Sequence, residues 1–482
     1  MSHRPNFLIF VPDQLRADAV GAFGNPRAHT PALDALAARG TRFTNAFVQH
    51  PVCSPSRASF LTGWYPHTAG HRTLTSLLRP HEPNLLRSLK EAGYHVTWLG
   101  KRGDTFAPGV TELSVHEYGF NEPVADDLTV VGGQGPSRQR GFPDDVWARL
   151  FYRGERPVGE VDHDEAAIQA GERWLADPPG EPWVLFVPLF APHCPFEVEQ
   201  PWFGMHDRAA VGDPVPPGEL TGEPRFMQAI RDAYGLDRVT PEMWREVIAT
   251  YYGMISRLDH QLGRLLAKTD ESTTVTLFFA DHGEYLGDYG LIEKWPTALQ
   301  PCITRDPLII AGGGLPGGNV YDGMVELLDI VPTVLELAGV EPGYRHFGRS
   351  LLPAIQDTTV QHREYAFTEA GFALEEAGWL PRPGFPYDLK GALQNERPDL
   401  VGKAIAVRDR AWTYVWRRYE QAELYHRVTD PQERENLAQR PEYRQALTRL
   451  HNAMLTWLVD TADVIPAGED PRFPVVVLPT PA

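Results

Sequence analysis

The stretch from residue 6 to residue 14, Asn-Phe-Leu-Ile-Phe-Val-Pro-Asp-Gln, carries the pattern that predicts the fold. Its apolar run ends at Pro12 and is followed by two polar residues, Asp13 and Gln14. Short apolar runs of this kind, separated by helical patterns, are typical of an α/β fold with a largely parallel sheet. Three further runs have the same form: 95–99 before Lys101, 183–190 before His193, and 275–280 before Asp281 and His282. Ligands of such sheets bind beyond the carboxyl ends of the strands, so we expect these polar residues at one rim.

Helical patterns lie between and after these runs, and they predict the layers that cover the sheet. The expected helices are 30–39, with Thr30 as N-cap and Pro31 at the first helical position, and 84–92, 164–176, 241–266 and 327–338. Residues 102–162 and 196–240 are rich in Pro and Gly and lack sustained periodicity. Segments of that length inside a compact domain are expected either to shape a binding site or to be locally disordered.

The sequence pattern changes after about residue 363, from alternating strand-like runs and helices to short strand-like runs in succession. Strand-like runs at 403–407, 411–416 and 422–425 precede a last helix near 441–458. We therefore predict two domains, a large α/β domain over 1–365 and a smaller α+β domain over 366–482.

Composition limits the partners and the compartment. Of the 482 residues, 45 are Lys or Arg and 63 are Asp or Glu, a net charge of −18 that argues against nucleic acid or an anionic membrane as the bulk partner. An anionic substrate then requires a locally positive pocket. The cysteines, Cys53, Cys194 and Cys302, show no CxxC pair, and the apolar run near the N-terminus is too short for a signal or membrane segment. We expect a cytoplasmic protein without membrane partner, and a homo-oligomer stays open.

A lone cysteine stands where a helical segment begins, in Cys53-Ser54-Pro55-Ser56-Arg57 followed by residues 58–63. The first-turn N–H groups of a helix have no intrahelical partner and stabilise a nucleophile or an anion placed there. Arg57 adds a fixed positive charge. The alternative is a buried cysteine before an ordinary helix.

Two pairs of residues at predicted strand ends suit a divalent cation: Asp13 with Gln14, and Asp281 with His282. Either pair alone fits a simple turn, but together with the cysteine loop they favour a metal site. Around an anion beside this metal we place Arg57, Lys101, His193 and Lys294. Their alternatives are two solvated surface lysines and a packed loop histidine.

With these residues in view, the chain resembles the type I sulfatase family of the alkaline phosphatase superfamily. Cys53-Ser54-Pro55-Ser56-Arg57 matches the family's C-x-P-x-R maturation signature. The supporting segments are 61–67, 93–101, 191–193, 252–259, 280–284, 329–333 and 423–437. The resemblance implies an alkaline phosphatase-like fold, in which helices sandwich a large, mostly parallel sheet.

The resemblance also implies a chemistry. Cys53 would be oxidised by a dedicated maturation enzyme to Cα-formylglycine, whose hydrate places one hydroxyl on the metal. One divalent metal ion is implied, Ca²⁺ in first place with Mn²⁺ or Mg²⁺ as alternatives, held by Asp13, Gln14, residue 53, Asp281 and His282. The catalytic residues would be Cys53, Arg57, Lys101, His193 and Lys294. The substrate would be a small anionic ester, and the reaction sulfate ester hydrolysis.

Two departures from the family pattern keep other functions open. Asp13-Gln14 is more similar to phosphonate monoester hydrolases and choline-sulfatase-like members than to the paired aspartates of many sulfatases. Gly100-Lys101-Arg102-Gly103 lacks the histidine of Gly-Lys-x-His, for which Asp104 or Thr105 are candidate substitutes. The alternatives are a phosphonate monoester or phosphodiester hydrolase on the same scaffold, and a binding protein whose Cys53 is never matured. A hydrolase using the Cys53 thiolate directly is disfavoured, because Cys–His–Asn spacing is missing.

Overall fold

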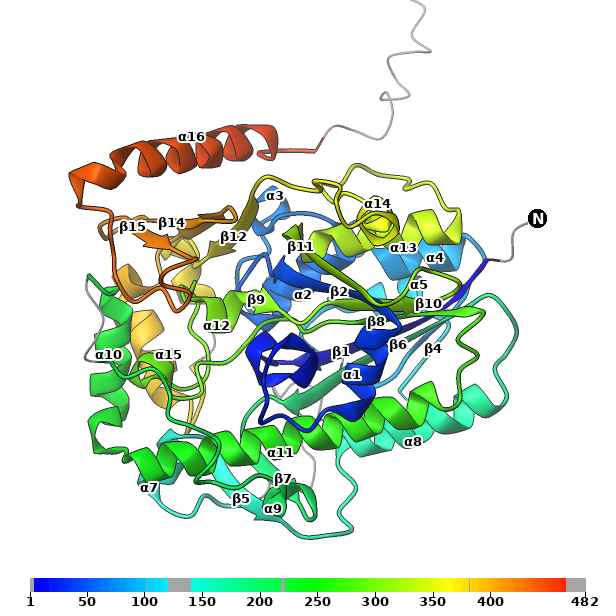
Figure 1. Cartoon of the computed structure of the whole chain (residues 1–482), viewed down its shortest axis with the longest axis horizontal. Coiled ribbons are helices and arrows are strands. Elements are labelled where there is room, and N and C mark those ends of the chain that lie inside the picture. The colour runs from blue at the N-terminus through cyan, green and yellow to red at the C-terminus, as the bar shows by residue number, and fades with distance from the viewer. Residues whose placement is uncertain (1–3, 102, 120–139, 218–221, 381, 465–482) are drawn as a thin grey trace, which may run out of the picture.

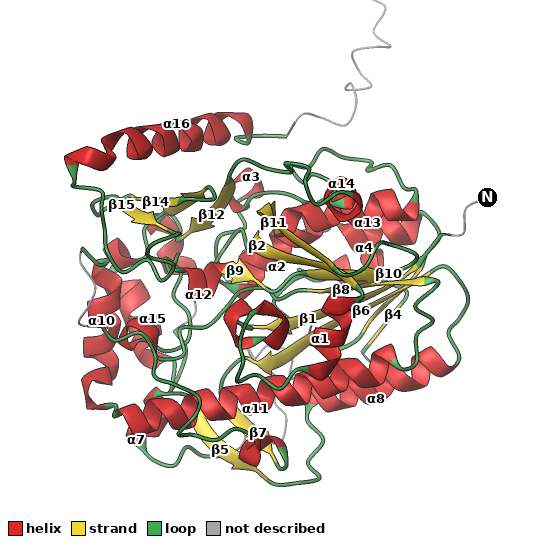
Figure 2. Ribbon diagram, in the orientation of Figure 1, coloured by secondary structure: helices red, strands yellow, loops and turns green. Residues whose placement is uncertain are grey.

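The computed structural model describes residues 4–101, 103–119, 140–217, 222–380 and 382–464. Arg102 lies outside this description, as do residues 465–482, which belong to the predicted C-terminal domain. A large sheet runs through the centre of the molecule, with helices on both faces (Figures 1 and 2). The strands lie in the order β11 (Asn319–Glu326), β2 (Gly40–Phe47), β10 (Ile309–Gly312), β8 (Thr274–Phe278), β1 (Asn6–Asp13), β6 (Trp183–Pro192), β3 (His95–Trp98) and β4 (Glu117–Tyr118).

The sheet is mostly parallel, as predicted, and the four predicted runs form its central strands. β1 pairs in parallel with β6 and β8, and β3 pairs in parallel with β6. The exceptions are β10, which is antiparallel to both of its neighbours, and the short β9 (Arg305–Asp306) on β2. Neither antiparallel strand was predicted.

Alternate residues of β1 enter two separate cores, as the period of two in a strand requires. Leu8 and Phe10 pack on one face of the sheet, and Phe7, Ile9 and Val11 pack on the other. The first core is closed by α1 (Pro31–Ala38), α8 (His163–Ala176) and α11 (Pro241–Leu266). The second is closed by α2 (Cys53–Thr62), α4 (Leu85–Glu91), α13 (Ile330–Ala338) and α14 (Leu352–Gln356). The central strands are therefore buried on both faces, and only their ends can carry a polar site.

Most predicted helices agree with the structure to within two residues. Thr30 is the N-cap residue of α1 and Pro31 begins the helix, as predicted, but the Thr30 side chain makes no capping hydrogen bond. Its Oγ1 accepts instead from the backbone N–H of Gly21, at 3.0 Å. The first turn of α1 is satisfied by the Asp259 carboxylate of α11, which accepts from Ala32 N at 3.0 Å and from Leu33 N at 2.7 Å. The expected helix over 327–338 begins as a 3₁₀ turn over Leu327–Asp329.

The two stretches without periodicity contain short elements. They are α5 (Val110–Ser114), α7 (Asp145–Arg149), β5 (Tyr152–Arg156), β7 (Phe196–Glu199), α9 (Trp202–Met205) and α10 (Arg225–Tyr234). Strands β5 and β7 pair with each other in parallel. Of these segments, β5, β7 and α9 contact α11, whereas α5 lies beside α4. β4, from the first stretch, extends the large sheet at its edge.

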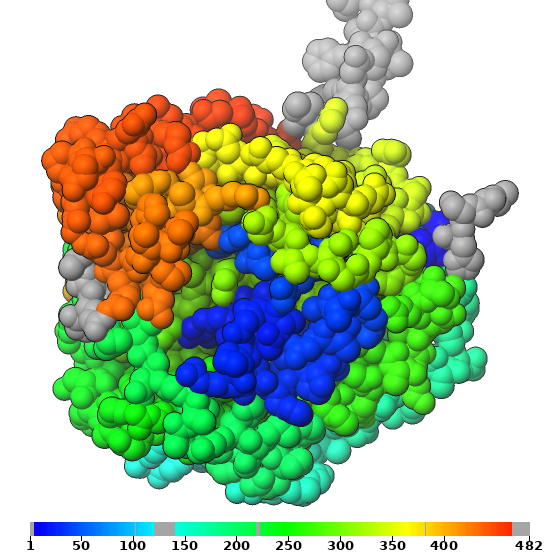
Figure 3. All heavy atoms as spheres, viewed as in Figure 1, coloured from blue at the N-terminus to red at the C-terminus, as the bar shows by residue number. Residues whose placement is uncertain are grey.

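The C-terminal part forms a small antiparallel sheet. Its strands are β12 (Ala366–Ala370), β13 (Ala404–Arg408), β14 (Trp412–Arg417) and β15 (Glu423–His426), and α16 (Arg444–Asp460) covers it. In Figure 3 the orange residues of this part gather at one corner of the molecule. The core under α16 includes Tyr65 and Leu328 from the larger part. A domain boundary at 365 stays a prediction.

The chain also forms two short helices, α3 (Pro66–Ala69) and α12 (Pro301–Thr304). A longer helix, α15 (Asp388–Glu396), lies between β12 and β13 in the chain. Within the described chain, no helix combines the length and the apolar character that crossing a bilayer requires.

Candidate active site

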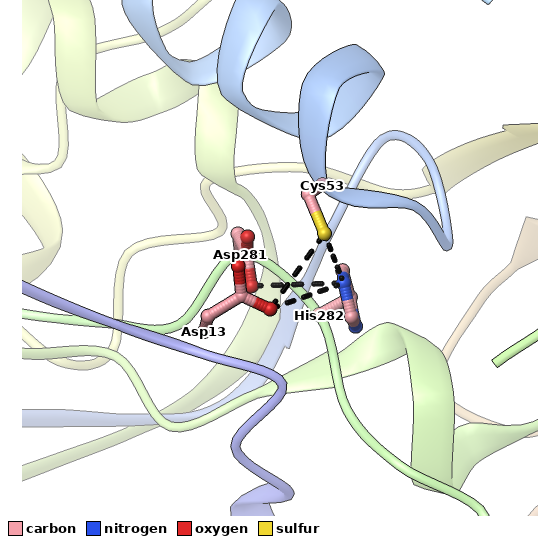
Figure 4. A group of neighbouring side chains, drawn as sticks. All are labelled: Asp13, Cys53, Asp281 and His282. Atoms are coloured by element: carbon pink, nitrogen blue, oxygen red, sulfur yellow. Dashed lines mark hydrogen bonds and ion pairs between the residues drawn. The ribbon is translucent and has the colours of Figure 1, made fainter. Parts of the chain in front are cut away.

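Three chain segments converge at the carboxyl end of β1. Asp13 is the last residue of β1, Asp281 and His282 follow β8, and Cys53 is the first residue of α2. Figure 4 shows the Cys53 side chain pointing from α2 toward the other three. The donor atoms of these four residues lie within 4.8 Å of one another, and all four residues are buried. The structure thus brings together four of the five predicted metal-site residues, including the nucleophile Cys53.

The orientation of His282 indicates what this group can hold. Its Nδ1 lies 2.9 Å from the carbonyl oxygen of Gly283, and because a carbonyl only accepts, we assign the ring proton to Nδ1. The lone pair of Nε2 then faces Asp13 Oδ1 and Asp281 Oδ1, each at 3.8 Å. Burial lowers the pKa of His282, which favours this neutral form.

A lone pair and two carboxylate oxygens that face one another favour a cation between them. One imidazole nitrogen and two carboxylates are an ordinary donor set for a divalent ion. The residues present therefore fit the divalent cation that the sequence predicts, and the donor set does not choose among Ca²⁺, Mn²⁺ and Mg²⁺.

Arg57 and Lys101 hold the two aspartates as anions. Arg57 is 1% exposed, with Nε 2.9 Å from Asp281 Oδ2 and Nη2 3.2 Å from Asp13 Oδ2. Lys101 Nζ donates to the same oxygen of Asp13. Burial opposes ionisation of Asp13, but the cations around it, Lys101 first and then Arg57 and Lys294, hold its pKa well below the ordinary value.

Asp104 takes a place beside these cations. Its Oδ2 lies 2.8 Å from Lys101 Nζ and 3.3 Å from Arg57 Nε, and its Oδ1 accepts from Thr105 Oγ1 at 3.2 Å. Asp104 therefore contacts the cationic side of the site, where it fixes Lys101. Whether either residue substitutes for the missing histidine stays a prediction.

Gln14 adopts a left-handed backbone, with φ of 66°, which is uncommon outside glycine and asparagine. This conformation lets its N–H donate to Asp281 Oδ1 at 3.0 Å, which ties the ends of β1 and β8 together. Its side-chain Nε2 donates to Glu284, and its Oε1 accepts from Lys294 Nζ at 2.5 Å. The amide oxygen predicted as a ligand thus points to Lys294 in this structure, and its role as a ligand stays a prediction.

Lys294 and His193 lie together beside Gln14. Nζ of Lys294 is 2.9 Å from His193 Nε2, and His193 Nδ1 is 2.5 Å from the carbonyl oxygen of Cys194. Burial and the charge of Lys294 lower the pKa of His193 well below its ordinary value, so the ring is neutral and accepts from Lys294. His193, Cys194 and Glu293 form a second cluster of metal-ligating atoms, but the ammonium of Lys294 already contacts His193 and Glu293 there.

The Cys53 thiol is a poor nucleophile as it stands. Its Sγ lies 3.2 Å from His282 Nε2 and 3.6 Å from Asp13 Oδ1. Burial and the charge of Asp13 raise its pKa well above the ordinary value, so the thiol stays protonated near neutral pH. Direct thiolate catalysis is disfavoured on these grounds as well.

Sequence reasoning missed three charged residues of the site: Glu284, Glu293 and Lys390. Glu284 lies inside the quoted segment 280–284, and its position there was the available signal. Burial and the neighbouring Glu293 raise the pKa of Glu284 to about 7. Lys390 lies on α15, far along the chain from any motif, and nothing in the sequence pointed to it.

The chain is similar in sequence and in fold to known proteins. The family model described as Sulfatase matches residues 5–340. A protein named Sulfatase from Formosa agariphila is 28% identical over 76% of this chain and 76% of its own length. The multifunctional alkaline phosphatase superfamily protein PehA of Trinickia caryophylli is 28% identical over 95% and 96%. Among solved structures, the phosphonate monoester hydrolase of Agrobacterium radiobacter superposes with a TM-score of 0.73 at 23% identity, covering 95% of this chain and 96% of that one.

The structural likeness confirms the alkaline phosphatase-like α/β fold. The family match extends from the first strand of the large sheet to the helix after β11 and includes each of the predicted site residues. This chain belongs to the sulfatase family of sulfuric ester hydrolases, within the alkaline phosphatase superfamily.

Proposed function

We propose that this protein hydrolyses sulfate esters through a formylglycine formed from Cys53, beside one divalent cation. The observation that carries the proposal is the meeting of Cys53 with the donor atoms of Asp13, Asp281 and His282 within 4.8 Å. Those residues would hold the cation, with Gln14 as a further candidate ligand. The hydrated aldehyde would supply a hydroxyl nucleophile and the cation a Lewis acid.

The residues around this group are suited to an anionic ester. Lys101 and Arg57 lie on the side of Asp13, and Lys294 lies on the side of Gln14, so cations flank the position of residue 53. Nη1 of Arg57 is buried and has no hydrogen-bond partner among the described residues, which leaves a donor for an oxygen. One preorganised donor of this kind contributes about 3 kcal/mol to transition-state stabilisation.

Lys294 and His193 would serve the leaving oxygen. When the sulfur–oxygen bond breaks, that oxygen keeps the bonding pair and needs a hydrogen-bond donor or a proton. Lys294 carries N–H donors, and the neutral His193, 2.9 Å away, accepts from it through Nε2. The pair can therefore share a proton with the departing oxygen.

A second candidate function is hydrolysis of phosphonate monoesters or phosphodiesters by the same residues. Gln14 after Asp13 and the missing histidine after Lys101 favour it. The proteins that this chain is similar to include one named for phosphonate monoesters and one named multifunctional.

The first experiment compares purified wild type with Cys53→Ala on p-nitrophenyl sulfate and p-nitrophenyl phenylphosphonate. We expect a higher kcat/KM for the sulfate, and a loss of at least about 10⁴-fold in Cys53→Ala, since the nucleophile is removed. The control is Cys302→Ala, which removes another buried thiol on α12 and should keep wild-type rates. Turnover retained by Cys53→Ala would contradict the proposal. A higher kcat/KM for the phosphonate would assign the second function, and an unmodified, inactive wild type would indicate a binding protein.

A further inference from the structure

A lysine from the C-terminal part contacts the loop that carries Glu293 and Lys294. Lys390 lies on α15, outside the residues 5–340 that the family model matches, and its side chain is only 6% exposed. Its Nζ donates to Glu293 Oε2 and to the backbone carbonyl oxygen of Lys294. A buried ammonium is retained only where such partners repay its desolvation.

Glu293 connects Lys390 to Lys294, because it contacts both side chains. Its Oε1 accepts from Lys294 Nζ at 2.9 Å, and its Oε2 accepts from the backbone N–H of Lys294 at 2.8 Å. The carboxylate is thus held between two lysines. Its left-handed backbone, with φ of 64°, and the donation of its N–H to Glu284 fix the loop that presents it.

The three N–H donors of Lys294 already have three acceptors. They are Gln14 Oε1 at 2.5 Å, Glu293 Oε1 at 2.9 Å and His193 Nε2 at 2.9 Å. To donate to a substrate oxygen, Lys294 must exchange one of them. Among the three, Glu293 is the acceptor whose second oxygen is anchored by a buried lysine, so it is the contact best suited to persist.

We propose that Lys390 is a positioning residue, which holds Glu293 and the Lys294 carbonyl so that the Lys294 ammonium stays aimed at the leaving oxygen. The inference rests on the proposed function, because it assigns Lys294 to the leaving-group side. It adds a residue of the C-terminal part to the machinery of the family-matched part.

A merely structural role for Lys390 has a distinct signature. The chain after α15 is also held against the loop that carries Lys294 by contacts without charged side chains. Trp295 Nε1 and Thr297 Oγ1 both donate to the carbonyl oxygen of Leu400, at 3.1 and 3.0 Å. Loss of docking would lower all rates and the Tm together. If Lys294 were instead no longer positioned toward the leaving oxygen, kcat/KM would fall most for esters with poor leaving groups.

The experiment measures kcat/KM for a series of aryl sulfates whose phenols differ in pKa, with wild type, Lys390→Met, Lys390→Arg and Thr297→Val. In Lys390→Met we expect a loss of about 10-fold for nitrophenyl sulfate rising to about 100-fold for the poorest leaving group, since misplacing a catalytic group by about 1 Å costs this much. The plot against phenol pKa thus becomes steeper. Lys390→Arg keeps the charge and should restore most of the wild-type slope. Thr297→Val should lower Tm and leave the slope unchanged.

Parallel plots for wild type and Lys390→Met would overturn the inference while leaving the proposed function intact. Wild type without turnover of any aryl sulfate would instead refute the proposed function, and the same series made with aryl phosphonates then decides the role of Lys390. If Lys390→Met does not fold, Glu293→Gln removes the intermediate carboxylate charge and must steepen the plot in the same way. An unchanged slope in that variant contradicts the proposal.

Discussion

Two buried clusters in this molecule place one arginine between two carboxylates, and they differ in what the carboxylate oxygens face. Arg363 lies between Glu326 and Asp329, where β11 ends and the C-terminal part begins. Arg57 lies between Asp13 and Asp281 at the end of β1. The carboxylates of both clusters are fully buried.

Around Arg363 each carboxylate oxygen accepts from a protein donor. Asp329 accepts from the backbone N–H groups of Glu326 and Arg349, at 3.1 and 2.7 Å, and from the guanidinium. Glu326 accepts from Tyr65 and from the backbone N–H of Phe367, at 2.7 and 2.6 Å. Around Arg57, Asp13 Oδ1 faces the Cys53 thiol and the lone pair of His282. The thiol is a weak donor, 3.6 Å from Asp13 Oδ1, so this oxygen is the one most readily given over to a ligand, whereas the strong donors around Arg363 stabilise the fold.

In the comparison of the two clusters, the largest expected effect comes from Asp281→Asn. It removes one carboxylate donor of the proposed cation site and one partner of Arg57, so we expect kcat on an aryl sulfate to fall by at least about 10³-fold. The wild type should also lose activity on chelation and regain it with added Ca²⁺, Mn²⁺ or Mg²⁺, and the variant should not respond.

The matched variant in the other cluster is Asp329→Asn. Breaking a buried ion pair on one side costs about 3–5 kcal/mol of stability, so Tm should fall while kcat per folded molecule stays close to wild type. If this variant does not fold, Glu326→Gln makes the same test. A large loss of kcat in either variant, at unchanged Tm, would erase the distinction between the clusters.

A smaller effect is expected from Lys101→Met. The ammonium that contacts Asp13 and Asp104 would no longer stabilise the charge that develops on the substrate, and kcat should fall by about 10²–10³-fold. Lys90→Met is the control, because Lys90 on α4 donates to the backbone carbonyls of Glu112 and Val115, away from the site. Equal rates for Lys101→Met and wild type would remove Lys101 from the proposed mechanism.

The smallest effect concerns a buried carboxylate held by backbone donors, Asp259 under α1. Burial raises its pKa from 3.8 to about 6, although the two N–H groups oppose the shift. A group with a raised pKa in the folded state contributes stability that is present below pH 4 and is lost as the pH rises through about 6.

Wild type should therefore lose stability relative to Asp259→Asn between pH 4 and pH 7, by at most about 3 kcal/mol. Denaturant unfolding of both proteins at several pH values measures this difference. A difference that stays constant across that range would show that Asp259 does not titrate as described.

The central strands and the four-residue group were predictable because their signals are local. Each strand is a short apolar run that ends in a polar residue, and the rule that ligands lie beyond parallel strand ends brings Asp13 and Asp281 together. The Cys53 helix start follows from Pro55 in the first turn and the apolar residues after it. These features need no knowledge of how distant segments pack.

What could not be predicted depends on contacts between segments. The cap of α1 comes from Asp259 of α11, and no pattern around Thr30 indicates that its hydroxyl bonds Gly21 instead. The antiparallel β10 is as apolar as a parallel strand, so its direction is invisible in residues 309–312. Lys390 reads as a surface lysine, and it becomes part of the site because α15 packs against the loop that carries Glu293 and Lys294.

The most direct test of the central claim is the mass of the tryptic peptide that spans residues 43–57 and contains Cys53, taken from protein purified from its native host. We predict a species about 18 Da lighter than the unmodified peptide, the change expected when a cysteine thiol becomes a formylglycine aldehyde. Across preparations, the fraction of this lighter peptide should rise in proportion to the aryl sulfatase activity. A fully active preparation in which every copy of this peptide retains an unmodified thiol would contradict the account.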